Sequence, residues 1–258
     1  MSHFVVIVTN TDCETLEEQL EPFYEQGNED DYFMEKEYFL ERNEKAVNNW
    51  LNNEIGNING AINHPRITEP ARKIWRKSLK KLENIKKLKT LRGKVNAIHR
   101  YEGGGIDEDG LYWLSNPNAK WDWWVEGGRW DGWLVKKNGE RCNRCLVKEL
   151  DFEGMKKAEL EDRAKWYDEE IKRAKEDGRK PFFFDFKETP TKEEYVNQKV
   201  WLSPYAVLHN GKWIEKGEMG WWGIDDPHYT DEDWEKKFQE FFKTLDPETE
   251  IAIVDCHI

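Results

Sequence analysis

Three residues at the two ends of the chain could together carry out acid–base chemistry. His3 stands near the start of the sequence, and Asp255 and His257 stand near its end. Two imidazoles can act as general base and general acid near neutral pH, while a carboxylate orients one of them. In the alternative interpretation, two terminal histidines merely cap a sheet. The catalytic interpretation requires the two ends of the chain to be neighbours.

Apolar runs at both ends predict the strands that would bring these residues together. Residues 4–8 are continuously apolar, which is typical of a strand buried on both faces, and residues 251–258 predict a last strand. We expect the two strands to be adjacent and antiparallel, so that His3 lies close to His257. Asp255 would share the face of His257 because strand side chains alternate.

A tryptophan-rich segment, residues 116–134, is the second candidate site. The glycine pair at 127–128 lets the backbone approach a ligand closely, and the Arg129 guanidinium could hold a phosphate with two hydrogen bonds. Flanking indoles offer stacking faces for a base. In the alternative interpretation, the segment is a structural hairpin in which Arg129 stacks on an indole. The ligand-binding residues expected here are Lys120, Trp124, Arg129 and Trp130, with Asp122 as a polar neighbour.

A second loop rich in glycine and tryptophan spans residues 217–223. Glu218 could act as an acid or accept a hydrogen bond, and Trp221 could stack on a base. Such aromatic loops also pack against the fold without binding anything, so both interpretations stay open. We count Glu218 and Trp221 among the expected ligand-binding residues.

Cys142 and Cys145 form a Cys-x-x-Cys pair, but the sequence offers no second pair at zinc spacing. We therefore expect neither a metal site nor a redox role, and no cofactor. Nucleotide-binding glycine loops and the nucleophile elbow of serine hydrolases are also missing from the sequence. The four cysteines of this long chain favour a reduced, cytoplasmic setting over a disulfide framework.

Composition limits the classes of partner. The net charge of -12 argues against a general nucleic-acid binder, although it leaves room for a local cationic pocket. No segment approaches the roughly 20 apolar residues that span a bilayer, and Met1 leads directly into the first apolar run, so we expect neither membrane association nor a signal peptide. A homo-oligomer is compatible with the sequence.

Residues 71–91 combine apolar residues at helical spacing with many lysines and arginines. This pattern predicts a helix that is either a nucleic-acid or partner-binding element or a solvated face, and the solvated face is the simpler interpretation. The next apolar stretch, residues 95–101, predicts a strand.

The order of elements predicts an α+β fold. A strand and helix begin the chain, and a hairpin, helix and strand end it, with helical sequence between. We expect one domain over residues 1–258, with a ferredoxin-like split βαβ antiparallel core and a large helical insertion at approximately 30–92.

Several of these segments resemble a family of accessory proteins of tailed phages. The shared sequence segments are residues 1–4 (MSHF), 20–23, 116–124 (NPNAKWDWW), 127–130 (GGRW), 151–155, 211–223 and 254–258 (VDCHI). The resemblance covers both ends and the tryptophan-rich centre, but not the stretch from 30 to 91. It implies a protein of the infected bacterial cytoplasm, in a class in which counter-defence proteins are common.

Together these features predict a metal-independent phosphodiesterase that cleaves a cyclic nucleotide signal of host immunity. His3 and His257 would be base and acid, with Asp255 beside them, and Arg129 would stabilise the charged phosphorane. The alternatives are a sponge that sequesters such a nucleotide without cleaving it and an inhibitor that docks on a host defence protein.

Overall fold

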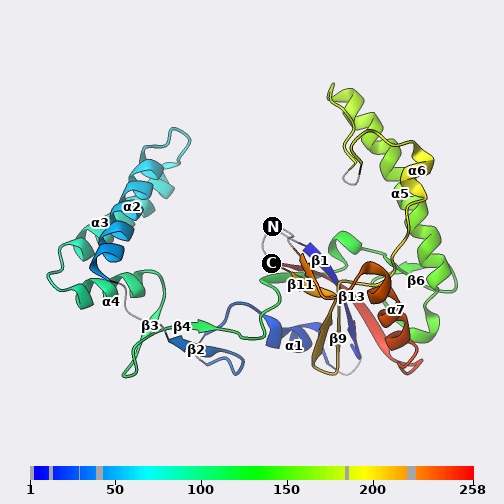
Figure 1. The fold of residues 1–258 in the computed structure, drawn as a ribbon, viewed down its shortest axis with the longest axis horizontal. Helices are drawn as coiled ribbons and strands as arrows, with labels where there is room; N and C mark the ends of the chain where they lie inside the picture. The colour runs from blue at the N-terminus through cyan, green and yellow to red at the C-terminus, as the bar shows by residue number, and fades with distance from the viewer. Residues whose placement is uncertain (1–2, 12–13, 29, 39–42, 184–185, 220–224) are drawn as a thin grey trace. The chain divides into compact units, whose positions relative to one another are not determined.

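The computed structural model describes residues 3–11, 14–28, 30–38, 43–183, 186–219 and 225–258 (Figure 1). Its contacts divide the chain into two compact units. The first unit consists of Met1–Tyr24 and Lys120–Ile258, and the second consists of Glu25–Ala119. The second unit is thus an insertion in the first. It is longer on both sides than the expected insertion at 30–92, and the expectation of one domain stays a prediction.

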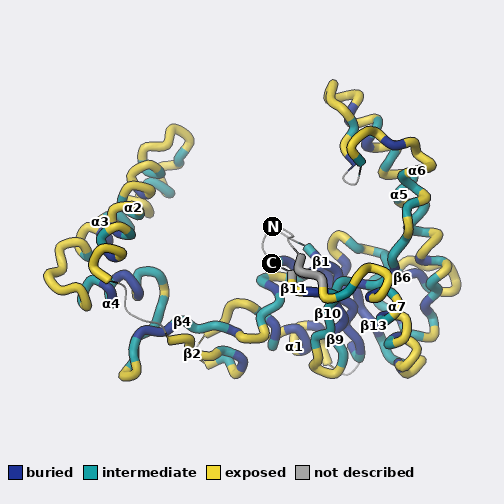
Figure 2. The backbone as a smooth tube through the Cα atoms, in the orientation of Figure 1, coloured by how far each residue is buried: buried dark blue, intermediate teal, exposed yellow. Residues whose placement is uncertain are grey.

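The first and last strands are the centre of the sheet in the first unit. Strand β1 (His3–Thr9) pairs antiparallel with β13 (Glu250–His257), and His3 lies opposite His257 in the register. The sequence prediction of adjacent, antiparallel terminal strands is therefore confirmed. Nearly every residue of both strands is buried, as their continuous apolar sequence requires (Figure 2).

The other neighbour of β1 makes the sheet mixed. Strand β9 (Ala206–His209) pairs parallel with β1, and β10 (Lys212–Glu215) adds an antiparallel edge through the expected hairpin. Asn210 and Gly211 form its turn with φ of 50° and 70°. A split ferredoxin-like core would be antiparallel throughout. The predicted combination of helices and strands is therefore confirmed, but the ferredoxin-like arrangement is not.

The far side of β13 is shared by two short strands. Strand β5 (Trp123–Glu126) pairs with the last four residues of β13, and β8 (Arg144–Leu146) pairs with its beginning. The sheet order is therefore β10-β9-β1-β13-β5, with β8 also on β13. This arrangement brings the tryptophan-rich segment against the C-terminal strand.

Both faces of the sheet are covered by helices. On one face, β1 residues such as Val5 and Ile7 pack with Phe238 of α7 (Asp231–Phe242) and Met155 of α5 (Phe152–Glu176). On the other face, Phe4 and its alternating neighbours pack with Leu20 of α1 (Leu16–Leu20). The alternation follows from the two-residue period of a strand.

The remaining elements of this unit are short. They are the 3-10 helices η1 (Glu21–Phe23), η2 (Gly128–Trp130) and η3 (Val147–Glu149), the helix α6 (Lys192–Val196), and the paired strands β6 (Leu134–Val135) with β7 (Arg141–Cys142) and β11 (Gly217–Met219) with β12 (Asp225–Pro227). No helix in the described part of the chain is long and apolar enough to cross a membrane.

The second unit is mostly helical. Helices α2 (Glu44–Asn63), α3 (Glu69–Lys86) and α4 (Leu91–Tyr101) share a core that includes Leu51, Leu82 and Ile98. A three-stranded antiparallel sheet contains β2 (Glu35–Tyr38), β4 (Leu111–Ser115) and β3 (Gly105–Ile106) in that order. The strand expected at 95–101 is wrong, because these residues belong to α4.

Candidate active site

The ends of β1 and β13 place two imidazoles in contact. His3 is the first residue of β1 and His257 is the last of β13. Their ring centroids lie 5.0 Å apart, with the planes at 76° in an edge-to-face arrangement. The two rings are therefore close enough to each other for the shared site that the catalytic interpretation requires.

Each histidine has a carboxylate of its own. His3 Nδ1 lies 2.9 Å from Asp255 Oδ1, and His257 Nδ1 lies 2.5 Å from Asp122 Oδ1. A carboxylate accepts, so each hydrogen bond favours the tautomer with the proton on Nδ1 and leaves Nε2 for acid–base chemistry. The sequence predicted Asp255 beside the histidines, whereas it suggested Asp122 only as a polar neighbour of the tryptophan segment.

The Asp255 carboxylate is buried and fixed from two sides. Its side chain is 2% exposed, and its second oxygen, Oδ2, accepts a 3.0 Å hydrogen bond from the backbone N–H of Arg129. The approach of that backbone depends on Gly128, which has a φ of 55°. A Cβ at Gly128 would lie 2.5 Å from Asp255 Cβ, so a glycine at this position is what allows the backbone to approach the carboxylate.

Trp123 forms one wall of the site. Its ring is stacked on His257 at a centroid distance of 5.3 Å and 16°, and it meets His3 edge-on at 5.3 Å. The register explains this position, because Trp123 lies opposite His257 in the β5–β13 pair. The sequence analysis did not single out Trp123. Only the strand register distinguishes it from its tryptophan neighbours.

The two histidines differ in exposure. The His3 side chain is 12% exposed, whereas that of His257 is 5% exposed. His257 Nε2 is buried and has no hydrogen-bond partner in the described part of the chain. His3 is therefore the more accessible of the two imidazoles.

Two expected ligand-binding residues lie away from the histidines. Trp124 pairs with Cys256, so it projects from the opposite face of the sheet and packs on the core beside α1. Lys120 binds Glu215 of β10 at 2.6 Å, and the same carboxylate accepts from Trp213 Nε1. Alternation and an ion pair place both side chains away from the histidines, and ligand contacts by Lys120 and Trp124 stay predictions.

The remaining residues expected to bind a ligand lie in different environments. Arg129 reaches the site through its backbone, and its exposed guanidinium makes no ion pair or hydrogen bond with the other described residues. Trp130 is partly buried against the α7-side core, and Glu218 is exposed on β11. Trp221 lies outside the described residues. Ligand contacts by Arg129, Trp130 and Glu218 stay predictions.

The Cys-x-x-Cys pair does not provide a thiolate. Burial raises the pKa of Cys145 to about 12 and also raises the pKa of Cys142. A thiol at such a pKa stays protonated near neutral pH and is a poor metal ligand or nucleophile. Within the described ranges, no group of three or more His, Cys, Asp or Glu side chains could hold a metal ion.

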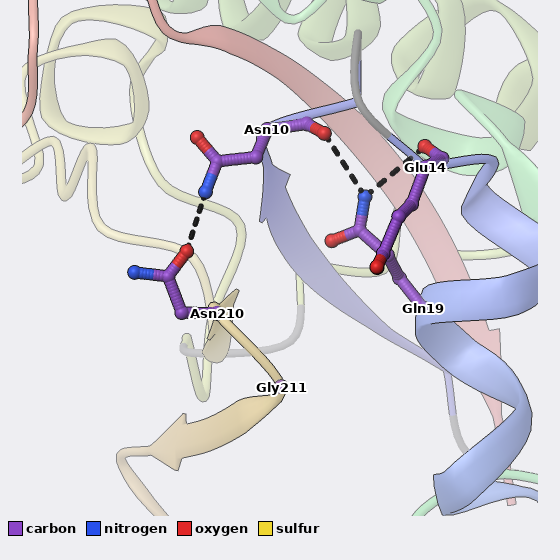
Figure 3. A pocket seen from close by; sticks show the side chains of 5 residues that line it. All are labelled: Asn10, Glu14, Gln19, Asn210 and Gly211. Atoms are coloured by element: carbon purple, nitrogen blue, oxygen red, sulfur yellow. Dashed lines mark hydrogen bonds between the residues drawn. The ribbon is translucent and has the colours of Figure 1, made fainter.

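An open pocket lies at the other end of β1 (Figure 3). It is lined by Asn10, Glu14, Gln19, Asn210 and Gly211. The amides of Asn10 and Asn210 bond to each other at 2.6 Å, and Gln19 Nε2 donates to the carbonyls of Asn10 and Glu14. Its side chains thus largely satisfy one another, and the histidine pair is the stronger candidate for chemistry.

Comparisons with known proteins do not assign a function, so a proposal has to rest on the geometry of the site. No protein-family model, curated protein or solved structure matches this chain. The resemblance to tailed-phage accessory proteins accordingly stays an expectation.

Proposed function

We propose that this protein is a metal-independent phosphodiesterase that opens a cyclic ribonucleotide signal of host immunity. The observation that carries the proposal is the pair of adjacent imidazoles, each bonded through Nδ1 to its own carboxylate. Transfer of a phosphoryl group from a 5′-oxygen to a neighbouring 2′-oxygen needs one base and one acid, and no metal. Two oriented imidazoles can supply both.

The reaction proceeds by exchange of one bond at phosphorus. One imidazole takes the proton of the ribose 2′-hydroxyl while the 2′-oxygen forms a bond to phosphorus. The bond from phosphorus to the 5′-oxygen breaks, and the other imidazole, protonated, gives its proton to that oxygen. The ring opens to a linear nucleotide with a 2′,3′-cyclic phosphate, and atoms and charge balance without a co-reactant.

Two nearby side chains suit this substrate class. The Trp123 indole is 43% exposed beside both imidazoles and could stack on a base. The Arg129 guanidinium is exposed one residue after Gly128, whose backbone touches Asp255. A guanidinium there could bind the equatorial oxygens of the phosphorane in a bidentate manner.

Binding without cleavage is the second candidate function. The burial of His257 Nε2 favours it, because a general acid or base must come within hydrogen-bond reach of the proton that it transfers. A sponge for a nucleotide signal would need Trp123 and Arg129 but no exposed Nε2 on His257.

One experiment separates the two functions. The protein is incubated with cyclic di- and trinucleotides, denatured, and the released nucleotides are separated by chromatography. A phosphodiesterase yields linear products that carry a 2′,3′-cyclic phosphate, with or without EDTA. The matched 2′-deoxy cyclic nucleotides should bind but stay intact, because they lack the attacking hydroxyl. Release of intact ribonucleotides after tight retention would favour the sponge.

A further inference from the structure

The basic helix α3 and the residue at its C-cap, Lys87, carry five lysines that share one face. Their spacing of three, four and seven residues places them on the same side of a helix with 3.6 residues per turn. Leu79, Leu82 and Ile85 lie on the opposite side, where α3 packs in the core of the second unit. We call this set the lysine face; its members are Lys73, Lys77, Lys80, Lys81 and Lys87.

Among the described residues, no acidic side chain forms an ion pair with the lysine face, although Glu83 lies three residues after Lys80. All five lysines are exposed (Figure 2), and none forms an ion pair or side-chain hydrogen bond with another described residue. Glu69, the acid at the start of α3, is bonded to Arg72 and Arg76 instead. Like charges at these spacings destabilise a helix, so the stability of the fold does not explain them.

Helix α5 of the same chain provides a comparison, because its exposed acidic and basic side chains are nearly balanced in number. It carries eight acidic and seven basic residues, whereas α3 carries two acidic and seven basic residues. Its exposed lysines pair at i and i+4 with glutamates, as in Lys157–Glu161, Lys165–Glu169 and Lys172–Glu176. The contrast favours a polyanionic partner for α3 over simple solvation.

We propose that the lysine face binds the phosphate backbone of a double-stranded nucleic acid without reading its sequence. Lysine ammonium groups bind phosphates as point charges. From Lys73 to Lys87 the helix rises about 21 Å, which matches about six base pairs. The net charge of -12 predicts no general nucleic-acid binding, so the proposal concerns this face alone.

The chemistry of α3 distinguishes this partner from others. A helix that lies in a membrane surface inserts a continuous apolar side. In α3 that side is buried in the core at Leu82, which is 0% exposed, and only Ile74 and Trp75 near its start are large apolar side chains that stay exposed. Single strands are usually held by aromatic side chains between the cations, and the lysine face has none. A duplex offers a regular row of phosphates and requires neither.

The test measures binding of a labelled 20-base-pair duplex to the full chain by fluorescence anisotropy between about 50 and 200 mM salt. The central variant is the triple change Lys77→Gln, Lys80→Gln and Lys81→Gln. The matched control is Lys157→Gln, Lys165→Gln and Lys172→Gln on α5. A third protein carries arginine at the three α3 positions.

The proposal predicts a salt slope of log K against log salt near −4, and a loss of about tenfold or more in affinity for the α3 glutamine variant, with a slope smaller by about 3. The α5 variant and the arginine variant should stay within about twofold of the wild type. Circular dichroism checks that each variant is folded.

Three outcomes would overturn the proposal. The first is no binding of the duplex by the wild type up to 100 µM at the lowest salt. The second is an equal loss of affinity in the α3 and α5 glutamine variants. The third is tighter binding of polyglutamate or of anionic vesicles than of the duplex, which would assign the face to a protein or a membrane.

Discussion

At the scale of single residues, Gly128 allows the backbone to approach the Asp255 carboxylate. Its φ of 55° suits glycine, and its Cα leaves room for Asp255 that a methyl group would fill. His3, which is bonded to Asp255, thus depends on a residue that has no chemistry of its own. This dependence can be tested against a second glycine of the same backbone class.

We predict that Gly128→Ala displaces Asp255 and reduces turnover of a cyclic ribonucleotide by about 100-fold, in the range typical of a lost acid–base group. Gly139 is the control, because its φ is 85° and nothing lies within 4 Å of a Cβ built there. Gly139→Ala should cost only about 1–2 kcal/mol of backbone strain and leave turnover unchanged. Equal turnover in the two variants would remove Gly128 from the account.

Sequence reasoning could not decide which tryptophan of the segment faces the histidines, and the reason is physical. In the run from Trp121 to Trp124, alternate side chains project to opposite faces, and a shift of one residue exchanges them. Composition alone cannot set that register, so Trp124 was chosen where Trp123 meets His257. Pairing on both sides of β13 buries His257, although it is the last residue of that strand.

At the scale of elements, the pairing of the two terminal strands was predictable, and the strands on either side of them were not. Two continuous apolar runs allow few arrangements other than central, paired strands. Which strand pairs with the other edge of β1 depends on how the chain returns from the inserted unit. The local sequence of β9 does not indicate that it is this strand. In α4, Val95, Ile98 and His99 are buried at helical spacing, but a short apolar run fits a strand as well.

The end of α5 offers a pH-dependent test. Hydrogen bonds from the Arg179 guanidinium and from the backbone of Phe182 lower the pKa of Glu170 to about 2. A depressed pKa in the folded state stabilises the protein above the unfolded value of about 4.5, and this contribution is lost as the pH falls towards 2.

Glu170→Gln should therefore lower the unfolding temperature at pH 7 relative to the wild type. The difference should shrink as the pH drops below about 4.5 and nearly vanish near pH 2. Thermal unfolding followed by circular dichroism at several pH values measures it. A difference that is the same at pH 7 and pH 3 would show that the carboxylate contributes through packing and not through its charge.

At the scale of the whole molecule, the inserted unit leaves and re-enters the first unit at one place. The backbone N–H of Lys120 donates to the carbonyl of Phe23 at 2.8 Å, and the rings of Tyr24 and Trp121 stack at 4.7 Å. The two ends of the insertion are thus already joined by non-covalent contacts. A short covalent link can replace the unit without moving either end.

We predict that a chain with Tyr24 joined to Lys120 by a short Gly-Ser linker folds cooperatively and retains turnover within about tenfold of the wild type. The same deletion should abolish duplex binding, because it removes the lysine face. Thermal unfolding, the cyclic nucleotide assay and duplex anisotropy test the three expectations together. Loss of folding on deletion would contradict the division into two units.

The central claim is that His3 and His257 transfer protons during cleavage. Its most direct test compares the wild type with His3→Gln and His257→Gln at saturating cyclic ribonucleotide, with ligand affinity measured separately. We predict that each change lowers turnover by about 10²-fold or more and changes affinity by less than about tenfold. Turnover at the wild-type rate in either folded variant, or tight binding without turnover by the wild type, would contradict the account.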